Sequence, residues 1–225
     1  MFIGHFAAGL AAKRAAPRAS LGVYFAAGQL LDLIWPVLVL AGAEHVAVDH
    51  AATAFTPLNF ISYPYSHSLM MTFIWSLLAG GIYYGLFKRV REAVVIGAVV
   101  ASHWVLDWLT HRPDLPLGVS DTHKVGLGLW NSVSATIVVE GSLFLIGLFL
   151  YLRATPTKSR SAIAIFWSLV LFLLVIYAGS AFGPKPPPDA TEPMIVMPAF
   201  AMWLIVVWGW WADKKRAGAP STAEK

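Results

Sequence analysis

Three ionisable side chains lie four residues apart in an otherwise apolar stretch, and their types are those of metal ligands. The stretch 101–111 contains His103, Asp107 and His111. On a helix, residues four apart stack on one face, roughly 6 Å apart per step. Imidazole nitrogens and carboxylate oxygens can each donate a lone pair to a divalent cation. The spacing therefore predicts the beginning of a metal site, with a capped helix end at a membrane interface as the alternative.

The composition indicates which kind of protein must position these side chains. The chain has 225 residues, of which 58% are hydrophobic and 12% are charged, and its mean hydropathy is +0.67. Soluble domains carry about twice that share of charge. The absence of cysteine excludes disulfides and thiolate ligands. The low charge and the long apolar runs predict an all-α polytopic membrane helix bundle. No nucleic-acid motif is present, so we expect no nucleic-acid partner.

Six apolar segments are long enough to cross a bilayer core of about 30 Å, and a shorter one precedes them. We expect the shorter segment, residues 2–12, to form an N-terminal half-helix. Pro36 predicts a kink near the far end of the first full span. We divide the chain into a four-span metal-site module, residues 1–153, and a pair of additional spans with a cytoplasmic tail, residues 154–225. The expected spans are 20–42, 67–87, 93–111, 127–152, 162–182 and 194–212.

The distribution of positive charge predicts the orientation of these spans. Of the 16 lysines and arginines, all but Arg112, Lys124 and Lys185 lie on one side of the six spans. Loops rich in lysine and arginine face the cytoplasm. We therefore expect both termini to be cytoplasmic. We expect the loops 43–66, 112–126 and 183–193 to be outside.

Depth within the membrane tests whether scattered polar residues can meet. At a rise of 1.5 Å per residue, Asp32, His103 and Glu140 lie roughly 18–21 Å above the basic residues that end their spans. His5 lies about 12 Å up if its helix enters from the cytoplasm, and His67 enters its span from outside. Buried charges at one depth need partners, and a single cation can neutralise several carboxylates together.

Glu140 has a further role in this prediction. Together with Ser132 and Thr136 it forms a polar stripe, four residues apart, on an apolar span. Its depth near the other ionisable residues makes it the candidate general base, and a polar helix seam is the alternative. We expect His45 and His50, in an outer loop, to be solvated.

Four short motifs, taken in order and with their spacing, resemble a known family. The chain is similar over about residues 1–115 to the bacterial inner-membrane family of membrane-bound metal-dependent hydrolases, also described as LexA-binding, inner-membrane-associated hydrolases. It departs from the family where a second aspartate is usual after the first span and where His-Arg-Gly is usual before the His-Ser pair. The motifs are His5–Gly9, Gly28–Asp32, Ser66–Ser68 and His103–Asp107.

The resemblance implies a multi-pass protein of the bacterial inner (plasma) membrane with one divalent metal ion, and we expect zinc. The expected ligands are Asp32, His67, His103 and Asp107, with His5 as a candidate fifth. A metal-activated water would hydrolyse a lipid or lipid-linked substrate, with membrane lipid around it. Two other classes stay open: a transporter that relays ions or protons, and a structural or assembly subunit without activity. The oligomeric state is left open.

Overall fold

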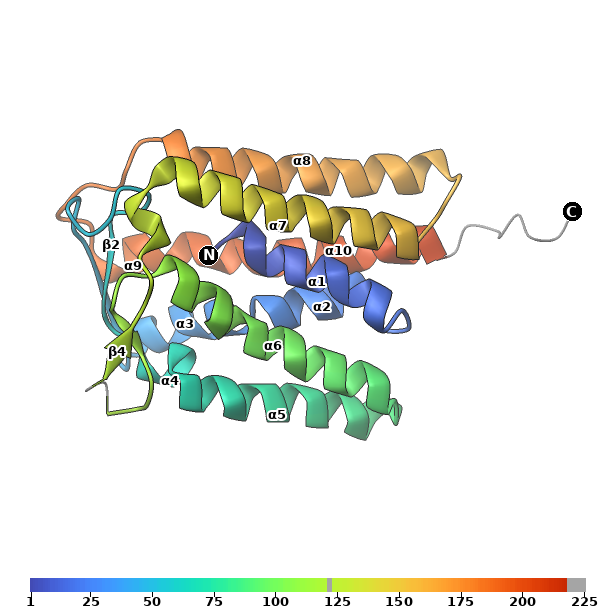
Figure 1. The fold of residues 1–225 in the computed structure, drawn as a ribbon, viewed down its shortest axis with the longest axis horizontal. Helices are drawn as coiled ribbons and strands as arrows, with labels where there is room; N and C mark the ends of the chain where they lie inside the picture. Colours follow the sequence, from blue (N-terminus) through green and yellow to red (C-terminus); the bar gives the residue numbers. More distant parts are fainter. Residues whose placement is uncertain (121–122, 218–225) are drawn as a thin grey trace, which may run out of the picture.

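The computed structural model describes residues 1–120 and 123–217, and these are mainly helical. Long helices lie side by side in a bundle, and short strands, turns and helices cover one end of it (Figure 1). The prediction of an all-α polytopic bundle is confirmed. The helices of the first half are α1 Ile3–Ala15, α2 Leu21–Gly28, α3 Leu30–Leu40, α4 Pro64–His67, α5 Leu69–Phe87 and α6 Val90–Thr110. Those of the second half are η1 Leu129–Asn131, α7 Val133–Ala154, α8 Arg160–Phe182, α9 Glu192–Val196, η2 Met197–Ala201 and α10 Met202–Ala217.

Among the described residues, five helical segments are long and apolar enough to cross a membrane, and the bent pair α2–α3 makes a sixth candidate. Large apolar side chains on the outward faces of the long helices are exposed, among them Phe73 and Ile82 on α5 and Leu171 on α8. Such faces suit hydrocarbon, and a helix satisfies its own backbone groups there. The chain is therefore built as a multi-pass membrane protein.

The first span is broken between α2 and α3. The chain bends there by 53°, at Gln29, and Pro36 lies farther on, inside α3. Helices α1 and α2 approach closely beside the bend, because a Cβ on Gly28 would lie 2.7 Å from the carbonyl oxygen of His5 on α1. The kink expected at Pro36 stays a prediction.

The expected half-helix is α1, and it lies at the centre of the bundle with α2, α6 and α7 against it (Figure 1). Most of its side chains are buried. Small residues allow this, because a Cβ on Gly147 of α7 would lie 2.5 Å from the carbonyl oxygen of Ala7. Helices approach closely in membranes where such residues meet. A helix too short to span the bilayer thus forms the axis of the fold.

The end of α1 away from the short strands is held by a buried ion pair. Lys13 Nζ donates to Asp213 Oδ2 of α10 at 2.6 Å, and Tyr151 of α7 donates to Oδ1 of the same carboxylate at 3.1 Å. The backbone N–H of Leu21 also donates to Asp213. Because one carboxylate binds groups from α1, α2 and α7, it fixes the last helix against the first part of the chain.

The opposite end carries two antiparallel strand pairs, β1 His45–Val48 with β2 Leu58–Ser62, and β3 Leu115–Pro116 with β4 Lys124–Val125. Two expected spans begin elsewhere than predicted. Residues 127–132 form a loop with the 3₁₀ turn η1, and α7 begins at Val133 after the capping side chain of Ser132. The last span is divided into α9, η2 and α10. The strand pairs and the loops around them cover the end of the bundle at which α1 begins.

Candidate metal centre

Five side chains from four helices meet at the end of the bundle that the strands cover. His5 comes from α1, Asp32 from α3, His67 from α4, and His103 and Asp107 from α6. Two groups of metal-binding atoms are formed, one from His5, His103 and Asp107 and one from Asp32, His67 and His103, and each group fits within 4.8 Å. The structure therefore brings together all five residues that the sequence proposes as ligands.

The distances between these atoms suit a small divalent cation. His103 Nε2 lies 3.0 Å from Asp107 Oδ2 and 3.8 Å from Asp32 Oδ2, and His67 Nε2 lies 3.3 Å from Asp32 Oδ1. His5 Nε2 lies 3.0 Å from Asp107 Oδ1. Tetrahedral bonds of about 2.0–2.1 Å to zinc would place ligand atoms about 3.4 Å apart. The observed distances scatter around that value.

His103 indicates that the two groups would hold one ion rather than two. Its Nδ1 lies 2.7 Å from the carbonyl oxygen of Gly28, an acceptor, so Nδ1 carries the proton and Nε2 carries the lone pair. One lone pair binds one cation. His103 Nε2 is buried and has no hydrogen-bond partner among the described residues, although Asp107 is close. A buried nitrogen that carries a lone pair and has no hydrogen-bond partner fits the role of a metal ligand.

A chain of hydrogen bonds from Glu44 through Ser66, here called the relay, orients His67. The sequence did not predict it. Ser66 Oγ lies 2.6 Å from His67 Nδ1 and 2.7 Å from Glu44 Oε2, to which it donates. The hydroxyl therefore accepts from Nδ1–H, and the lone pair of His67 is directed through Nε2 to the two aspartates. Glu44 is fully buried, and its other oxygen accepts the backbone N–H groups of Tyr65 and Ser66 at 2.8 Å.

Burial makes the charge of this cluster important. The side chains of His5 and His103 are 0% exposed and that of Asp107 is 2% exposed, whereas Asp32 is 26% exposed. The amino group of Met1 lies 2.5 Å from Asp107 Oδ1 and neutralises part of the two negative charges. Two carboxylates at this depth are costly without positive charge nearby. Asp32 has the most exposed of the five side chains.

Glu140 contacts the backbone at the start of α1 and not the cluster itself. Its Oε2 accepts from the N–H groups of Phe2 and Gly4 at 2.9 and 3.3 Å, and its Oε1 has no hydrogen-bond partner among the described residues. A carboxylate there satisfies N–H groups that a helix start leaves free. Glu140 thus supports the helix that carries His5, and its role as general base remains a prediction.

A cavity of about 180 Å³ connects the cluster with the covered end of the bundle. Asp32, His67 and Asp107 form part of its wall. The opposite part is aromatic, with Phe60 from β2 and Trp130 from η1. The cavity therefore combines polar groups of the cluster with an apolar wall.

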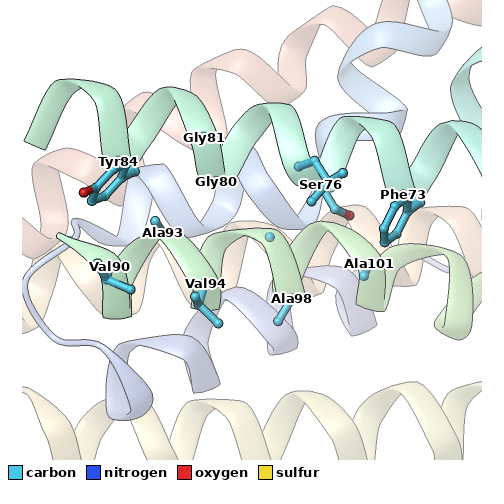
Figure 2. A pocket seen from close by; sticks show the side chains of 12 residues that line it. Phe73, Ser76, Gly80, Gly81, Tyr84, Val90, Ala93, Val94, Ala98 and Ala101 are labelled. Atoms are coloured by element: carbon cyan, nitrogen blue, oxygen red, sulfur yellow. The ribbon is translucent and has the colours of Figure 1, made fainter. Parts of the chain in front are cut away.

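A larger cavity lacks such chemistry. A groove of about 600 Å³ lies between α5 and α6, where Figure 2 shows Gly80 and Gly81 opposite Ala93 and Val94. Its walls are apolar apart from Ser76 and Tyr84. It lies on helices whose outward faces are exposed and apolar, so it is a surface for lipid rather than a second reactive site.

The outer-loop histidines lie apart from the cluster, as expected. His45 is half exposed and its Nδ1 lies 3.1 Å from Glu192, and His50 Nε2 lies 2.9 Å from the carbonyl oxygen of Pro186. Neither belongs to the groups of metal-binding atoms among the described residues. Both residues are exposed, as expected, and their lack of a metal role stays a prediction.

His111 and Asp114, at the end of α6 and just after it, are both buried. His111, the cap residue of α6, is 3% exposed and lines the cavity, and its Nδ1 lies 2.9 Å from Asp114 Oδ1. Burial alone would raise the pKa of Asp114, but hydrogen bonds from His111, Arg112 and Tyr63 hold it below the ordinary value. Asp114 therefore stays ionised, and its contact fixes how His111 faces the cavity.

Comparison of the chain with protein-family models, with curated proteins and with solved structures finds no match. The resemblance to the metal-dependent hydrolases therefore stays a prediction. The functional argument rests on the geometry of the cluster and its cavity.

Proposed function

We propose that this protein is a membrane-embedded, metal-dependent hydrolase of a lipid or lipid-linked substrate. One observation carries the proposal: three histidines and two aspartates from α1, α3, α4 and α6 form two adjoining groups of metal-binding atoms that share His103, inside a membrane bundle. Separate helices have no structural need to bring two carboxylates and three imidazoles together in an apolar interior. A bound divalent cation would neutralise the carboxylates and accept the lone pairs of the imidazoles, which would explain the arrangement.

Zinc is the ion that the donor set favours. Imidazole and carboxylate bind it well, the chain offers no thiolate, and the spacing of the donor atoms suits short bonds. A zinc ion held by histidine and aspartate lowers the pKa of a coordinated water to near neutrality and polarises a carbonyl or phosphoryl oxygen. Asp32, the most exposed of the five, is the ligand nearest to an incoming substrate.

The cavity narrows the class of substrate. Cavities that enclose a whole drug-sized molecule measure about 300–1,000 Å³, and this one measures about 180 Å³. It admits a phosphate or ester group with its nearest atoms, whereas a long apolar tail must stay outside it. A lipid or lipid-linked substrate, whose tail remains in the bilayer, meets that requirement.

The proposal includes an orientation. The loops at the end of the bundle away from the cluster carry basic residues, among them Arg89, Arg91 and Lys158. With that end in the cytoplasm of a bacterium, the cavity opens toward the outer side of the inner membrane. The substrate would then be a lipid of the outer leaflet, or one whose head group is presented there.

Metal analysis of the detergent-purified full chain tests the proposal. We expect one zinc ion per chain in the wild type, greatly reduced occupancy in Asp107→Asn and His103→Ala, and unchanged occupancy in His45→Ala. Hydrolysis of a panel of phospholipids and lipid-linked phosphates should be lost with the metal after chelation and return when zinc is added. A wild type without stoichiometric metal, purified in the absence of chelators, would remove the basis of the proposal.

One observation favours a second candidate, a transporter of metal ions or protons. The pair α2–α3 is a broken span, and Asp32 lies in the first turn after the break. Broken helices with ionisable residues mark ion sites in many transporters. Against this, Lys13 and Asp213 form a buried ion pair between helices at the far end of the bundle. Reconstituted vesicles separate the candidates, since a hydrolase acts without a gradient and a transporter moves zinc or protons without cleaving lipid.

A further inference from the structure

The wall of the reactive cavity carries a second polar group that the metal site does not use. His111 follows the last turn of α6, one turn beyond Asp107, and lines the same cavity as the aspartates. Its ring is packed between aromatic rings, with centroids 4.3 Å from Trp130 and 5.0 Å from Phe60. The imidazole is therefore held in place in the wall of the cavity.

Its partners determine which ring nitrogen is available. His111 Nδ1 lies 2.9 Å from Asp114 Oδ1, and Tyr63 donates its hydroxyl proton to the same oxygen at 3.1 Å. An ionised carboxylate only accepts, so Nδ1 carries a proton and Nε2 is the nitrogen left for the cavity. Arg112 Nε donates to the other oxygen of Asp114 at 3.1 Å, which keeps the carboxylate in place.

This arrangement is the one that positions a histidine for proton transfer. A carboxylate that holds one ring nitrogen selects the tautomer and stabilises the imidazolium when it forms. A histidine that only capped a helix would need neither a buried carboxylate partner nor a place in the wall of a cavity. The other titratable groups that line this cavity are Asp32, Asp107, His67 and the amino group of Met1.

We propose that His111 is a catalytic acid that protonates the leaving oxygen in the hydrolysis, with Asp114 as its positioning residue. The inference rests on the proposed function and adds a residue to it. A lone pair of water forms the new bond to phosphorus or acyl carbon, and the bond from that atom to the leaving oxygen breaks. Its electron pair stays on the leaving oxygen, which takes the proton from His111 Nε2. The proton that water releases restores His111, so the products are an alcohol and an acid.

The test compares leaving groups on the purified, zinc-loaded full chain. The probes are octyl and p-nitrophenyl phosphate, and the matching pair of butyrate esters. We expect His111→Gln to lower kcat for the octyl substrate by about 10²–10⁴-fold, the usual range for general acid catalysis. The p-nitrophenyl substrate should lose less than tenfold, because p-nitrophenolate leaves without a proton. Metal content should not change.

The controls separate this role from structure and from the metal. His45→Gln changes another histidine with a carboxylate partner, Glu192, away from the cavity, and should leave both rates unchanged. If His111→Gln yields no folded protein, Asp114→Asn should give the same leaving-group pattern. An equal loss with both leaving groups, or lost zinc, overturns the proposal. A wild type that binds zinc but cleaves no probe also overturns it, whereas one that binds no zinc overturns the proposed function as well.

Discussion

Replacing Glu44 by glutamine would test the relay that orients His67, without touching a ligand. In the wild type, Glu44 accepts three hydrogen bonds, two from backbone N–H groups and one from the hydroxyl of Ser66. A glutamine that keeps the backbone bonds places its NH₂ toward Ser66, and an NH₂ only donates. The hydroxyl must then accept from the amide and donate to His67 Nδ1. The proton of His67 moves to Nε2, the nitrogen that should bind the metal.

The size of the effect follows from that change. Disturbing a partner that orients a ligand typically weakens metal affinity by about 10–100-fold, or about 1.4–2.7 kcal/mol. Competition between metal-stripped protein and a chelator of known zinc affinity should show a Kd that is higher by this factor. The melting temperature of the metal-free protein reports separately on folding, because the bond between the buried residue 44 and Ser66 is changed.

A matched control exists on the exposed side of the molecule. Glu192 also accepts from a histidine and a backbone N–H, those of His45 and Val46, but lies outside the cluster. Glu192→Gln should leave the Kd unchanged. The relay would be refuted by an unchanged Kd in Glu44→Gln, or by an equal rise in both variants.

Three further predictions use other parts of the structure. Glu140→Gln keeps an oxygen for the start of α1 and should retain the metal, and a loss of turnover with full metal would make Glu140 the general base. Glu140→Ala should lower the free energy of unfolding by about 1–3 kcal/mol, because buried N–H groups lose their acceptor. Cysteines placed at Ala43, Val119 and Ala190 should react with an impermeant reagent from outside intact cells, and protection of all three would invert the orientation. Because the folded pKa of Asp114 lies below its unfolded value, its stabilising contribution is present above about pH 4 and is lost as pH falls through the folded value. Acid unfolding curves should therefore show Asp114→Asn converging with the wild type below about pH 4, and parallel curves would contradict this.

The sequence predicts the spans and the five ligands for the same physical reason. A constant rise per residue converts position in a span into depth, so position alone assigns Asp32, His103 and Glu140 to about one level of the membrane, with Asp107 one turn beyond His103. Side chains of metal-binding types that lie at one depth in an apolar protein have few other ways to be satisfied than a shared metal site. The structure then brings His5 and His67 into two adjoining groups that share His103.

The partners of the ligands could not be predicted in this way. Glu44 and Ser66 meet because a loop folds back, and loop paths leave no periodic pattern in the sequence. His111 is buried because Phe60 and Trp130, from separate loops, cover it. In each case contacts between distant segments decide the outcome.

The central position of α1 has a consequence for how the protein is made. At 13 residues this helix is about 20 Å long, too short to be inserted as a span of its own. Much of its packing is against α7, which follows more than a hundred residues later. During synthesis α1 must therefore wait near the membrane surface until that helix arrives. Chains that stop before Val133 should leave α1 accessible to protease, and the reactive centre forms only when the bundle closes around it.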